Sequence, residues 1–210
     1  MTPLARLLIA TKNAGKVTEF RSLLGHQAFI WLDDLTTISA KDPPEVEETG
    51  SSFLENASIK AAAYASHYGC WALADDSGLA VDALEGKPGI FSARWADMHG
   101  VGKGDAHNNH LVLKQLKEVP EAGRTARFLC ALALADEEGR IVMTCQDSVE
   151  GRLLREPRGS NGFGYDPLFF IDSLGKTTAE LTSQEKDAVS HRGKAMRMMA
   201  EMMKDEGLIE

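Results

Sequence analysis

Acidic side chains gather in two short segments of the sequence. Asp75 and Asp76 lie in "ADDSGL", at the end of an apolar run, and Glu47 and Glu48 lie in the upstream loop "EVEETG". Two such carboxylates about 4 Å apart would repel each other by about 4 kcal/mol at a surface-like dielectric. Mg²⁺ removes that repulsion and takes one or two carboxylates together with substrate phosphates. The pattern favours a metal or catalytic role over its alternative, an acidic turn in which an aspartate bonds its own backbone near Gly78.

A second group of polar side chains follows the first apolar run, in "LLIATKNAGKVTEF". A nucleotide-binding P-loop needs glycine where this chain has Ala10, and serine or threonine where it has Val17. What remains is a strand, a polar turn and a helix start, with Thr11, Asn13 and Lys16 in one loop. Free N–H groups at a helix start and a nearby lysine bind anions. The alternative is an ordinary strand-to-helix turn with a solvated lysine.

The glycine-rich segment "GSNGFGYDP" is the third candidate. Glycines let a backbone approach a ligand closely, and Phe163 and Tyr165 offer faces on which a base can stack. The alternative is a loop whose aromatic side chains pack on the core.

The fourth candidate is "SQEKDAVSHRGKAM" near the C-terminus. Asp187 and His191 are four residues apart and would pair on a helix. Lys186, His191 and Arg192 would form a cationic cluster at one helix end if the helix bends near Ser190 or Gly193. The alternative is a solvated charged face.

Two further patterns favour structure over chemistry. His107 and His110 have a spacing that metal sites use, but no Cys or Glu completes a set, and Asp105 is a natural N-cap. An apolar stripe in the last helix indicates core or a subunit interface. It comprises Val189, Met196, Met199 and Met203.

Composition narrows the class of protein. The 210 residues carry a net charge of −8, which argues against a nucleic-acid polymer as partner but allows a single nucleotide. Three cysteines without a metal or redox spacing indicate reduced thiols, and Arg6 interrupts the short apolar N-terminus. No apolar run approaches ~20 residues, so we expect no membrane span and a cytoplasmic protein.

Hydrophobic periodicity predicts the elements that must position these groups. Strands are expected at 4–10, 28–32, 70–75, 125–136, 140–151 and 168–171, the fourth and fifth as a hairpin around "EEGR". Helices are expected after residue 13, from about 53 to a stop at Gly69 with Ser52 and Glu55 as a capping box, at 109–119, and as one long helix from Ser183. Alternating strands and helices followed by a hairpin predict an α/β fold with a mixed sheet.

Five segments taken in order carry a specific resemblance. "TKNAGK", "EETGSSFLENASIKA", "ADDSGLAVDALEGKPGIFSARW", "GFGYDP" and "AELTSQEKDAVSHRGKA" resemble the inosine triphosphate pyrophosphatase family from the first strand to the final helix. The resemblance implies a central twisted sheet flanked by helices, with residues 1–210 forming one catalytic domain of two lobes around a cleft. It also implies hydrolysis of dITP, ITP and XTP to the monophosphate and pyrophosphate, with Mg²⁺ and a homodimer.

The resemblance also assigns roles to residues at matching positions. Asp76 is implied as the base that activates water, with Asp75 and Lys60 as supporting catalytic residues, and Glu47 and Asp76 as magnesium ligands. The implied substrate contacts are the phosphate loop Thr11, Lys12, Asn13, Ala14, Gly15 and Lys16, then Ser77, the base loop Phe163, Gly164, Tyr165 and Asp166, and, for the 6-oxo edge, Lys186, His191 and Arg192. Arg94 has no assigned role, and Glu85, Trp95 and Asp187 depart mildly from the family pattern.

Two other functions fit parts of the pattern. An aspartyl-phosphate phosphatase would use an aspartate of "DDSG" as nucleophile and release orthophosphate first. A regulatory nucleotide-binding module would use the acids only to hold a metal. Product analysis and turnover separate both from a pyrophosphohydrolase.

Overall fold

The computed structural model describes residues 4, 6–24, 31–33 and 42–209. The chain divides into two compact units, which are described below one at a time. The first unit takes its described residues from 1–76, 130–147 and 192–210, and the second consists of 77–129 and 148–191. Among the described residues, no helix combines the length and the apolar character needed to cross a lipid bilayer.

The strands form one mixed sheet of order β2-β1-β3-β4-β5-β6-β7. Their bounds are β1 Arg6–Ile9, β2 Trp31–Asp33, β3 Ala72–Val81, β4 Thr125–Ala135, β5 Ile141–Leu153, β6 Phe169–Ile171 and β7 Lys176–Thr177. β1 pairs in parallel with β2 and β3, whereas β5 and β6 pair antiparallel, as do β6 and β7. The predicted mixed α/β sheet is confirmed. Residues 28–30 of the predicted second strand and 34–41 of the following loop lie outside the described residues.

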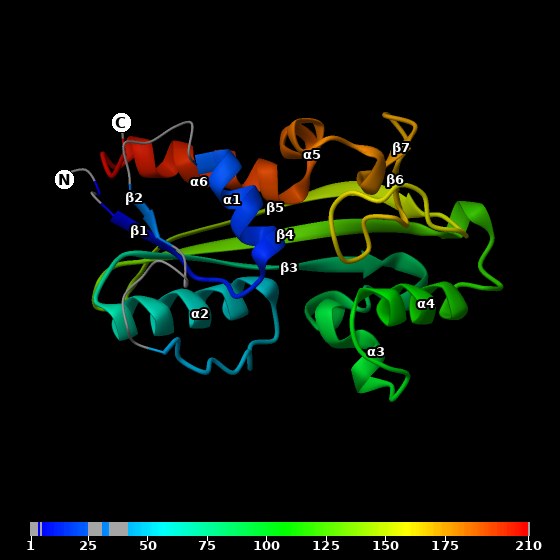
Figure 1. The fold of residues 1–210 in the computed structure, drawn as a ribbon, viewed down its shortest axis with the longest axis horizontal. Coiled ribbons are helices and arrows are strands. Elements are labelled where there is room, and N and C mark those ends of the chain that lie inside the picture. Colours follow the sequence, from blue (N-terminus) through cyan, green and yellow to red (C-terminus); the bar gives the residue numbers. More distant parts are fainter. Residues whose placement is uncertain (1–3, 5, 25–30, 34–41, 210) are drawn as a thin grey trace. The chain divides into compact units, whose positions relative to one another are not determined.

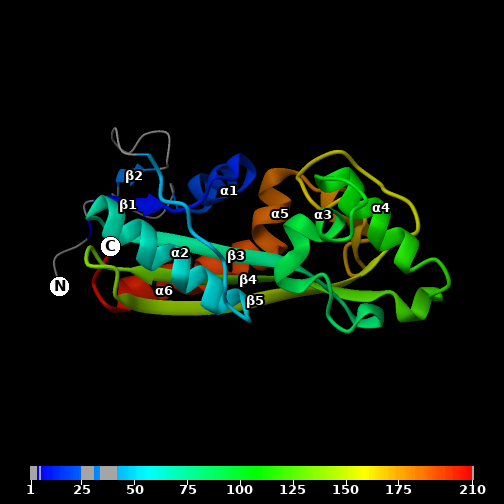
Figure 2. The same ribbon diagram turned by 90° about the horizontal axis from the view of Figure 1, so that it is seen from below.

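The helices are α1 Ala14–Leu24, α2 Phe53–Tyr68, α3 Trp95–Met98, α4 Asp105–Gln115, α5 Ser183–Val189 and α6 His191–Asp205. In the first unit, α2 covers one face of the strands, and α1 and α6 cover the other (Figures 1 and 2). Successive side chains along a strand point to opposite faces of the sheet, so each strand contributes side chains to both of these faces. Leu73 packs in the cluster with α1 and α6, while its neighbours Ala72 and Ala74 pack in the cluster with α2.

Alanines bring α2 close to the sheet. Ala57, Ala61 and Ala65 recur at one helical face and pack on strand alanines that include Ala72 and Ala133. The predicted ends of this helix are confirmed, because the Ser52 side chain accepts the Glu55 N–H at 3.2 Å and Gly69 adopts φ +63°. The Glu55 carboxylate, however, accepts the N–H of Ser51, at 2.6 Å, where a capping box would use that of Ser52.

The second unit has its own apolar cluster. It includes Leu79 of β3, Leu111 and Val112 of α4, and Leu168 and Phe169 around the start of β6. The long connection between β3 and α4 contains the 3-10 turns Asp82–Leu84 and Gly89–Arg94 as well as α3, so it is more than a plain turn, as predicted.

Three predicted elements differ from the structure. The C-terminal helix is broken at Ser190, whose extended backbone separates α5 from α6, so Asp187 and His191 do not share a helix. α4 begins at Asp105, four residues earlier than predicted, and its N-cap is Gly104. The stripe residues Met196, Met199 and Met203 are buried in the first unit's core, which excludes them as a subunit surface.

Candidate functional site

Asp75 and Asp76 lie inside a strand. The prediction that the preceding strand ends at these aspartates is wrong, because β3 continues from Ala72 to Val81. The element that ends here is its neighbour. β1 pairs Ile9 with Leu73 and then leaves the sheet, so Asp75 and Asp76 follow just beyond the carboxyl end of β1. Open α/β sheets bind ligands outside the carboxyl ends of their strands. The aspartates lie beside such an end, that of β1, and the predicted turn is absent.

The two aspartates point to opposite faces of the sheet. Successive side chains alternate along a strand. Asp75 therefore shares a face with Leu73, toward α1 and α6, while Asp76 shares a face with Ala74, toward α2. The alternation gives the two carboxylates separate partners and separate electrostatics.

Asp75 is held by two cations in a buried position. Its carboxylate lies 2.9 Å from Nζ of Lys16 in α1 and 3.3 Å from the guanidinium of Arg192 in α6. Arg192 also contacts Glu19 of α1. Burial alone would raise the pKa of Asp75, but Lys16 and Arg192 outweigh it and hold that pKa well below its usual range. Asp75 therefore remains ionised and fixes the Lys16 side chain.

The partners of Asp76 are Lys60 and Asn56, which both lie on α2. Its Oδ1 lies 3.3 Å from Nζ of Lys60, and its Oδ2 accepts a hydrogen bond from Asn56 at 3.1 Å. Burial raises the pKa of Asp76, and the nearby Glu48 adds to the rise, while Lys60 opposes it. Neighbouring carboxyls whose pKa values move in opposite directions are suited to different roles, and the raised one is the better proton acceptor near neutral pH.

The phosphate loop is shaped by its own side chains. Oγ1 of Thr11 accepts the Asn13 N–H at 3.2 Å, and Oδ1 of Asn13 accepts the Lys16 N–H at 3.1 Å. α1 then begins at Ala14 with no acidic residue in its first turn. A helix start of this kind favours an anion. Lys12, Asn13 and Ala14 are exposed, and Thr11, Gly15 and Lys16 are half-buried.

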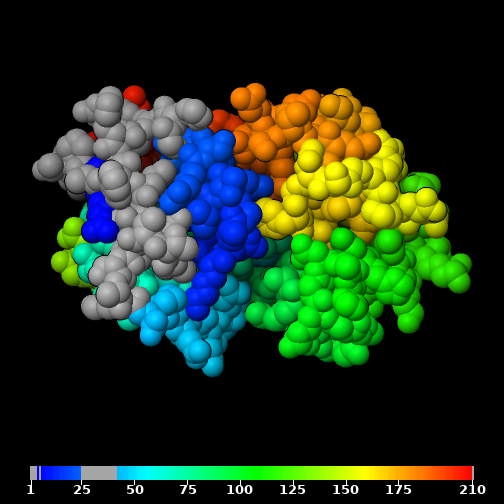
Figure 3. All heavy atoms as spheres, in the orientation of Figure 1, coloured from blue at the N-terminus to red at the C-terminus, as the bar shows by residue number. Residues whose placement is uncertain are grey.

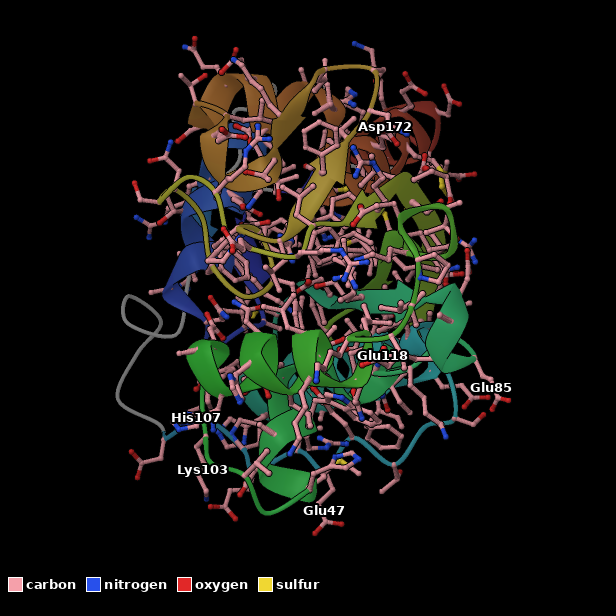
Figure 4. All side chains as sticks on the ribbon, turned by 90° about the vertical axis from the view of Figure 1, so that its right-hand side faces the viewer. Glu47, Glu85, Lys103, His107, Glu118 and Asp172 are labelled. Atoms are coloured by element: carbon pink, nitrogen blue, oxygen red, sulfur yellow. The ribbon has the colours of Figure 1, made fainter. Side chains whose placement is uncertain are left out.

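The acidic loop approaches the Asp76 group through Glu48. Oε1 of Glu48 lies 2.7 Å from Nζ of Lys60. Glu47 is exposed, and Figure 4 shows its side chain projecting outward. Within the described part of the chain, no three His, Cys, Asp or Glu residues gather as a metal cage. Nδ1 of His107 lies 2.8 Å from the Lys103 carbonyl oxygen.

In the second unit, Asp166 organises the base loop. Its Oδ2 accepts the N–H of Phe163 at 2.8 Å and lies 2.5 Å from Nζ of Lys186. Its Oδ1 accepts the hydroxyl of Thr178 at 2.9 Å. Asp166 is buried, so these contacts satisfy its charge within the protein. Its carboxylate positions Phe163 and Lys186.

The two aromatic residues of this loop have different environments. Tyr165 is buried, and its hydroxyl donates to the Ser92 carbonyl at 2.8 Å. Phe163 is half-buried, and Nζ of Lys186 lies 5.0 Å from its ring centroid. Phe163 is thus the ring available for stacking, and Tyr165 takes the core-packing alternative.

The residues predicted to read the 6-oxo edge lie in separate surroundings. Lys186 belongs to the second unit with Asp166, and His191 stacks on Phe128 in the same unit with ring centroids 4.9 Å apart. Arg192 belongs to the first unit with Asp75. Two further residues lie in the second unit: Ser77, next to Asp76 on β3, and Arg94, whose guanidinium lies over the Phe91 ring at 5.4 Å.

Comparisons with known proteins assign the family. The model of the Ham1 family matches residues 7–202. The chain belongs to the Ham1 family. A dITP/XTP pyrophosphatase from Exiguobacterium sibiricum is 48% identical over 194 residues, 92% of this chain and 94% of that protein. A dITP/XTP pyrophosphatase from Pseudomonas aeruginosa is 45% identical over 204 residues, 97% and 99% of the two chains. The structure of a HAM1 protein from Coxiella burnetii superposes with a TM-score of 0.83 at 41% identity, covering 96% of this chain and all of that one.

Ham1 membership confirms the predicted resemblance, and the structure adds residues that the sequence alone did not single out. Asn56 is fully buried and links the Gly50 N–H, at 2.8 Å, to Asp76. The sequence does contain a signal for Asn56, because Asn56 and Lys60 are four residues apart and so share one face of α2. Glu19 and Thr178 had no local signal, since each is brought to its partner by tertiary packing.

Proposed function

We propose that this chain is a nucleoside-triphosphate pyrophosphohydrolase that acts on dITP, ITP and XTP and releases the monophosphate and pyrophosphate. Two observations support the proposal. Ham1-family relatives named dITP/XTP pyrophosphatase align over nearly the whole chain. In the first unit, the Asp76 carboxylate, a candidate general base, lies beside the ammonium group of Lys60. The observation that carries the proposal is the Asp76 carboxylate between Lys60 and Asn56, with a pKa raised by burial.

The residues of the first unit suit attack on a phosphorus atom. Hydrolysis of a triphosphate needs its oxygens neutralised and a water aligned with the leaving group. Lys16 and Lys60 supply positive charge, and the phosphate loop supplies N–H groups at the start of α1. Asp76 accepts the proton of the attacking water, and its raised pKa favours that transfer.

Magnesium fits the residues around Asp76. Mg²⁺ prefers carboxylate oxygens, and it is bound by one or two of them with phosphates and waters completing the shell. Asp76 and Glu47 are the proposed ligands; Glu47 is exposed on the acidic loop, and its neighbour Glu48 contacts Lys60 beside Asp76. When bound, the ion neutralises charge on the phosphate oxygens.

The second unit is the proposed binding region for the base. Phe163 provides the stacking ring, and Lys186 beside it is a hydrogen-bond donor. A 6-oxo purine presents an acceptor where adenine presents a donor, so the second unit's donors at Lys186 and His191 would favour the oxo group. Adenine would leave a buried donor unsatisfied, which costs about 1–3 kcal/mol.

The proposal includes a cytoplasmic homodimer. With Met196, Met199 and Met203 in the core, the remaining candidate surface is the connection 85–104, which exposes Met98 and Val101. Sedimentation at micromolar concentration tests the dimer, and a mass of one chain would contradict it. Fractionation of expressing cells tests the location.

The decisive test is a panel of ITP, dITP, XTP, GTP and ATP with separate detection of pyrophosphate and orthophosphate, with and without Mg²⁺. We expect pyrophosphate as the first product, released from ITP, dITP and XTP at least tenfold faster than from ATP, and only with the metal. Orthophosphate as the first product or a phosphorylated aspartate would indicate the phosphatase instead. Tight ITP binding without turnover would indicate a regulatory module.

A further inference from the structure

Two side chains near the start of α4 hold one residue of the base loop, Gly164. The Asp105 carboxylate accepts the N–H of Gly164 at 2.7 Å, and the side-chain amide of Asn109 donates to the carbonyl of the same glycine at 3.0 Å. Asp105 and Asn109 are four residues apart and therefore share one face of α4. Both polar groups of one residue are thus held by one helix, in the second unit.

The gripped residue is the immediate neighbour of the stacking ring. Gly164 has φ +64°, a conformation that glycine adopts at little cost. On its N-terminal side, the Phe163 N–H is bound by Asp166, and on its C-terminal side, the Tyr165 hydroxyl is bound by the Ser92 carbonyl. The α4 contacts add the third anchor, and they act on the residue between the other two. Figure 3 shows the loop (yellow) against the surface of α3 and α4 (green).

Asp105 and Asn109 have side chains suited to binding the N–H and the carbonyl of Gly164. The sequence had suggested Asp105 as an N-cap in the segment "DAHNNH". Gly104 occupies the N-cap position and Asp105 is the first residue of the helix, so the Asp105 side chain does not serve as the N-cap. A carboxylate that accepts a backbone N–H makes a charge-assisted hydrogen bond, which is stronger than a neutral one. The amide of Asn109 complements it by donating to the carbonyl.

We propose that Asp105 and Asn109 are positioning residues that fix the backbone of Gly164 on both sides of its Cα and thereby the orientation of the Phe163 ring toward the purine. The inference rests on the proposed function, in which Phe163 stacks on the base. It assigns to α4 a role in affinity for the base and none in binding the triphosphate, since every contact in the clamp belongs to the second unit.

The kinetic test separates the two ends of the substrate. In Asp105→Ala, we expect the KM for ITP to rise about tenfold, because a charged hydrogen bond is lost. In Asn109→Ala, we expect it to rise about threefold, because the lost hydrogen bond is neutral. The kcat and the inhibition constant of inorganic tripolyphosphate should stay within twofold. Asp105→Asn keeps an acceptor oxygen and should restore most of the affinity. Asp97 lies on the neighbouring α3 and forms an exposed ion pair with Lys103, so Asp97→Ala is the matched control.

Hydrogen exchange tests the clamp without relying on activity. Peptides covering 160–166 should exchange at least fivefold faster in Asp105→Ala than in wild type or Asp97→Ala, with peptides of α4 unchanged. Unchanged exchange and unchanged KM, or equal weakening of ITP and tripolyphosphate, would overturn the inference. If the wild type fails to hydrolyse ITP, the proposed function is wrong, while the exchange result still decides whether the clamp exists.

Discussion

Replacing Asp75 by asparagine should destabilise the protein strongly. The Asp75 side chain is buried between Lys16 at 2.9 Å and Arg192 at 3.3 Å, and Asn keeps its shape but removes its charge. Removing one partner of a buried ion pair costs about 3–5 kcal/mol, because the remaining charge stays buried. Since Asn can still accept a hydrogen bond and Arg192 keeps Glu19, we expect a loss of about 3 kcal/mol.

The same substitution should change the response to acid. Burial would raise the pKa of Asp75, but Lys16 and Arg192 lower it well below the unfolded value of about 4. A carboxyl with a lowered folded pKa stabilises fully above the unfolded pKa, and its contribution is lost as the pH falls toward the folded pKa. The gap between wild type and Asp75→Asn should therefore be full at pH 7 and should shrink below about pH 4.

Urea titrations at pH 7 and at pH 3 to 4 measure both effects. Asp172→Asn serves as control, because Asp172 forms an exposed ion pair with Arg152, a class of interaction worth about 0–1 kcal/mol. A loss in Asp75→Asn no larger than in Asp172→Asn, or a gap that widens as the pH falls, would refute the reasoning.

Three further substitutions test other parts of the account. Arg124→Met removes donors to three backbone carbonyls, at 2.7 to 2.9 Å, and should lower the free energy of unfolding in urea by about 3 kcal/mol. Gly162→Ala would place a Cβ 2.0 Å from Oδ2 of Asp166 at φ +76°, so calorimetry should show a lowered Tm and kinetics a raised KM for ITP; unchanged values would contradict the clash. Asn56→Leu removes the link to Asp76 and should reduce kcat about tenfold or more, whereas an unchanged kcat would show that Asp76 needs no such support.

The sequence predicted elements whose signals are local. The ends of α2 were predictable because Ser52 and Gly69 act on the neighbouring turns of the helix. The alternation along β3 also predicts that consecutive aspartates face opposite ways, once the strand is known to continue.

Elements that depend on pairing were predicted less well. The segment from Asp75 to Gly78 has turn-forming residues, and the sheet holds it as a strand nonetheless, since tertiary pairing outweighs propensity. The break at Ser190 had no proline or glycine to mark it, because Gly193 lies inside α6. The partners of Arg192 on α1 lie far away in the sequence, so no local pattern announces them.

Turnover of ITP by Asp76→Asn tests the central claim most directly. Burial raises the pKa of Asp76, which means that its site disfavours the charged form, so a neutral Asn should cost little stability. Loss of a general base reduces the rate about 10²–10⁴-fold. The account predicts that pyrophosphate release falls at least 10²-fold while the free energy of unfolding changes by less than about 1 kcal/mol. Turnover within tenfold of wild type in this folded variant would contradict it.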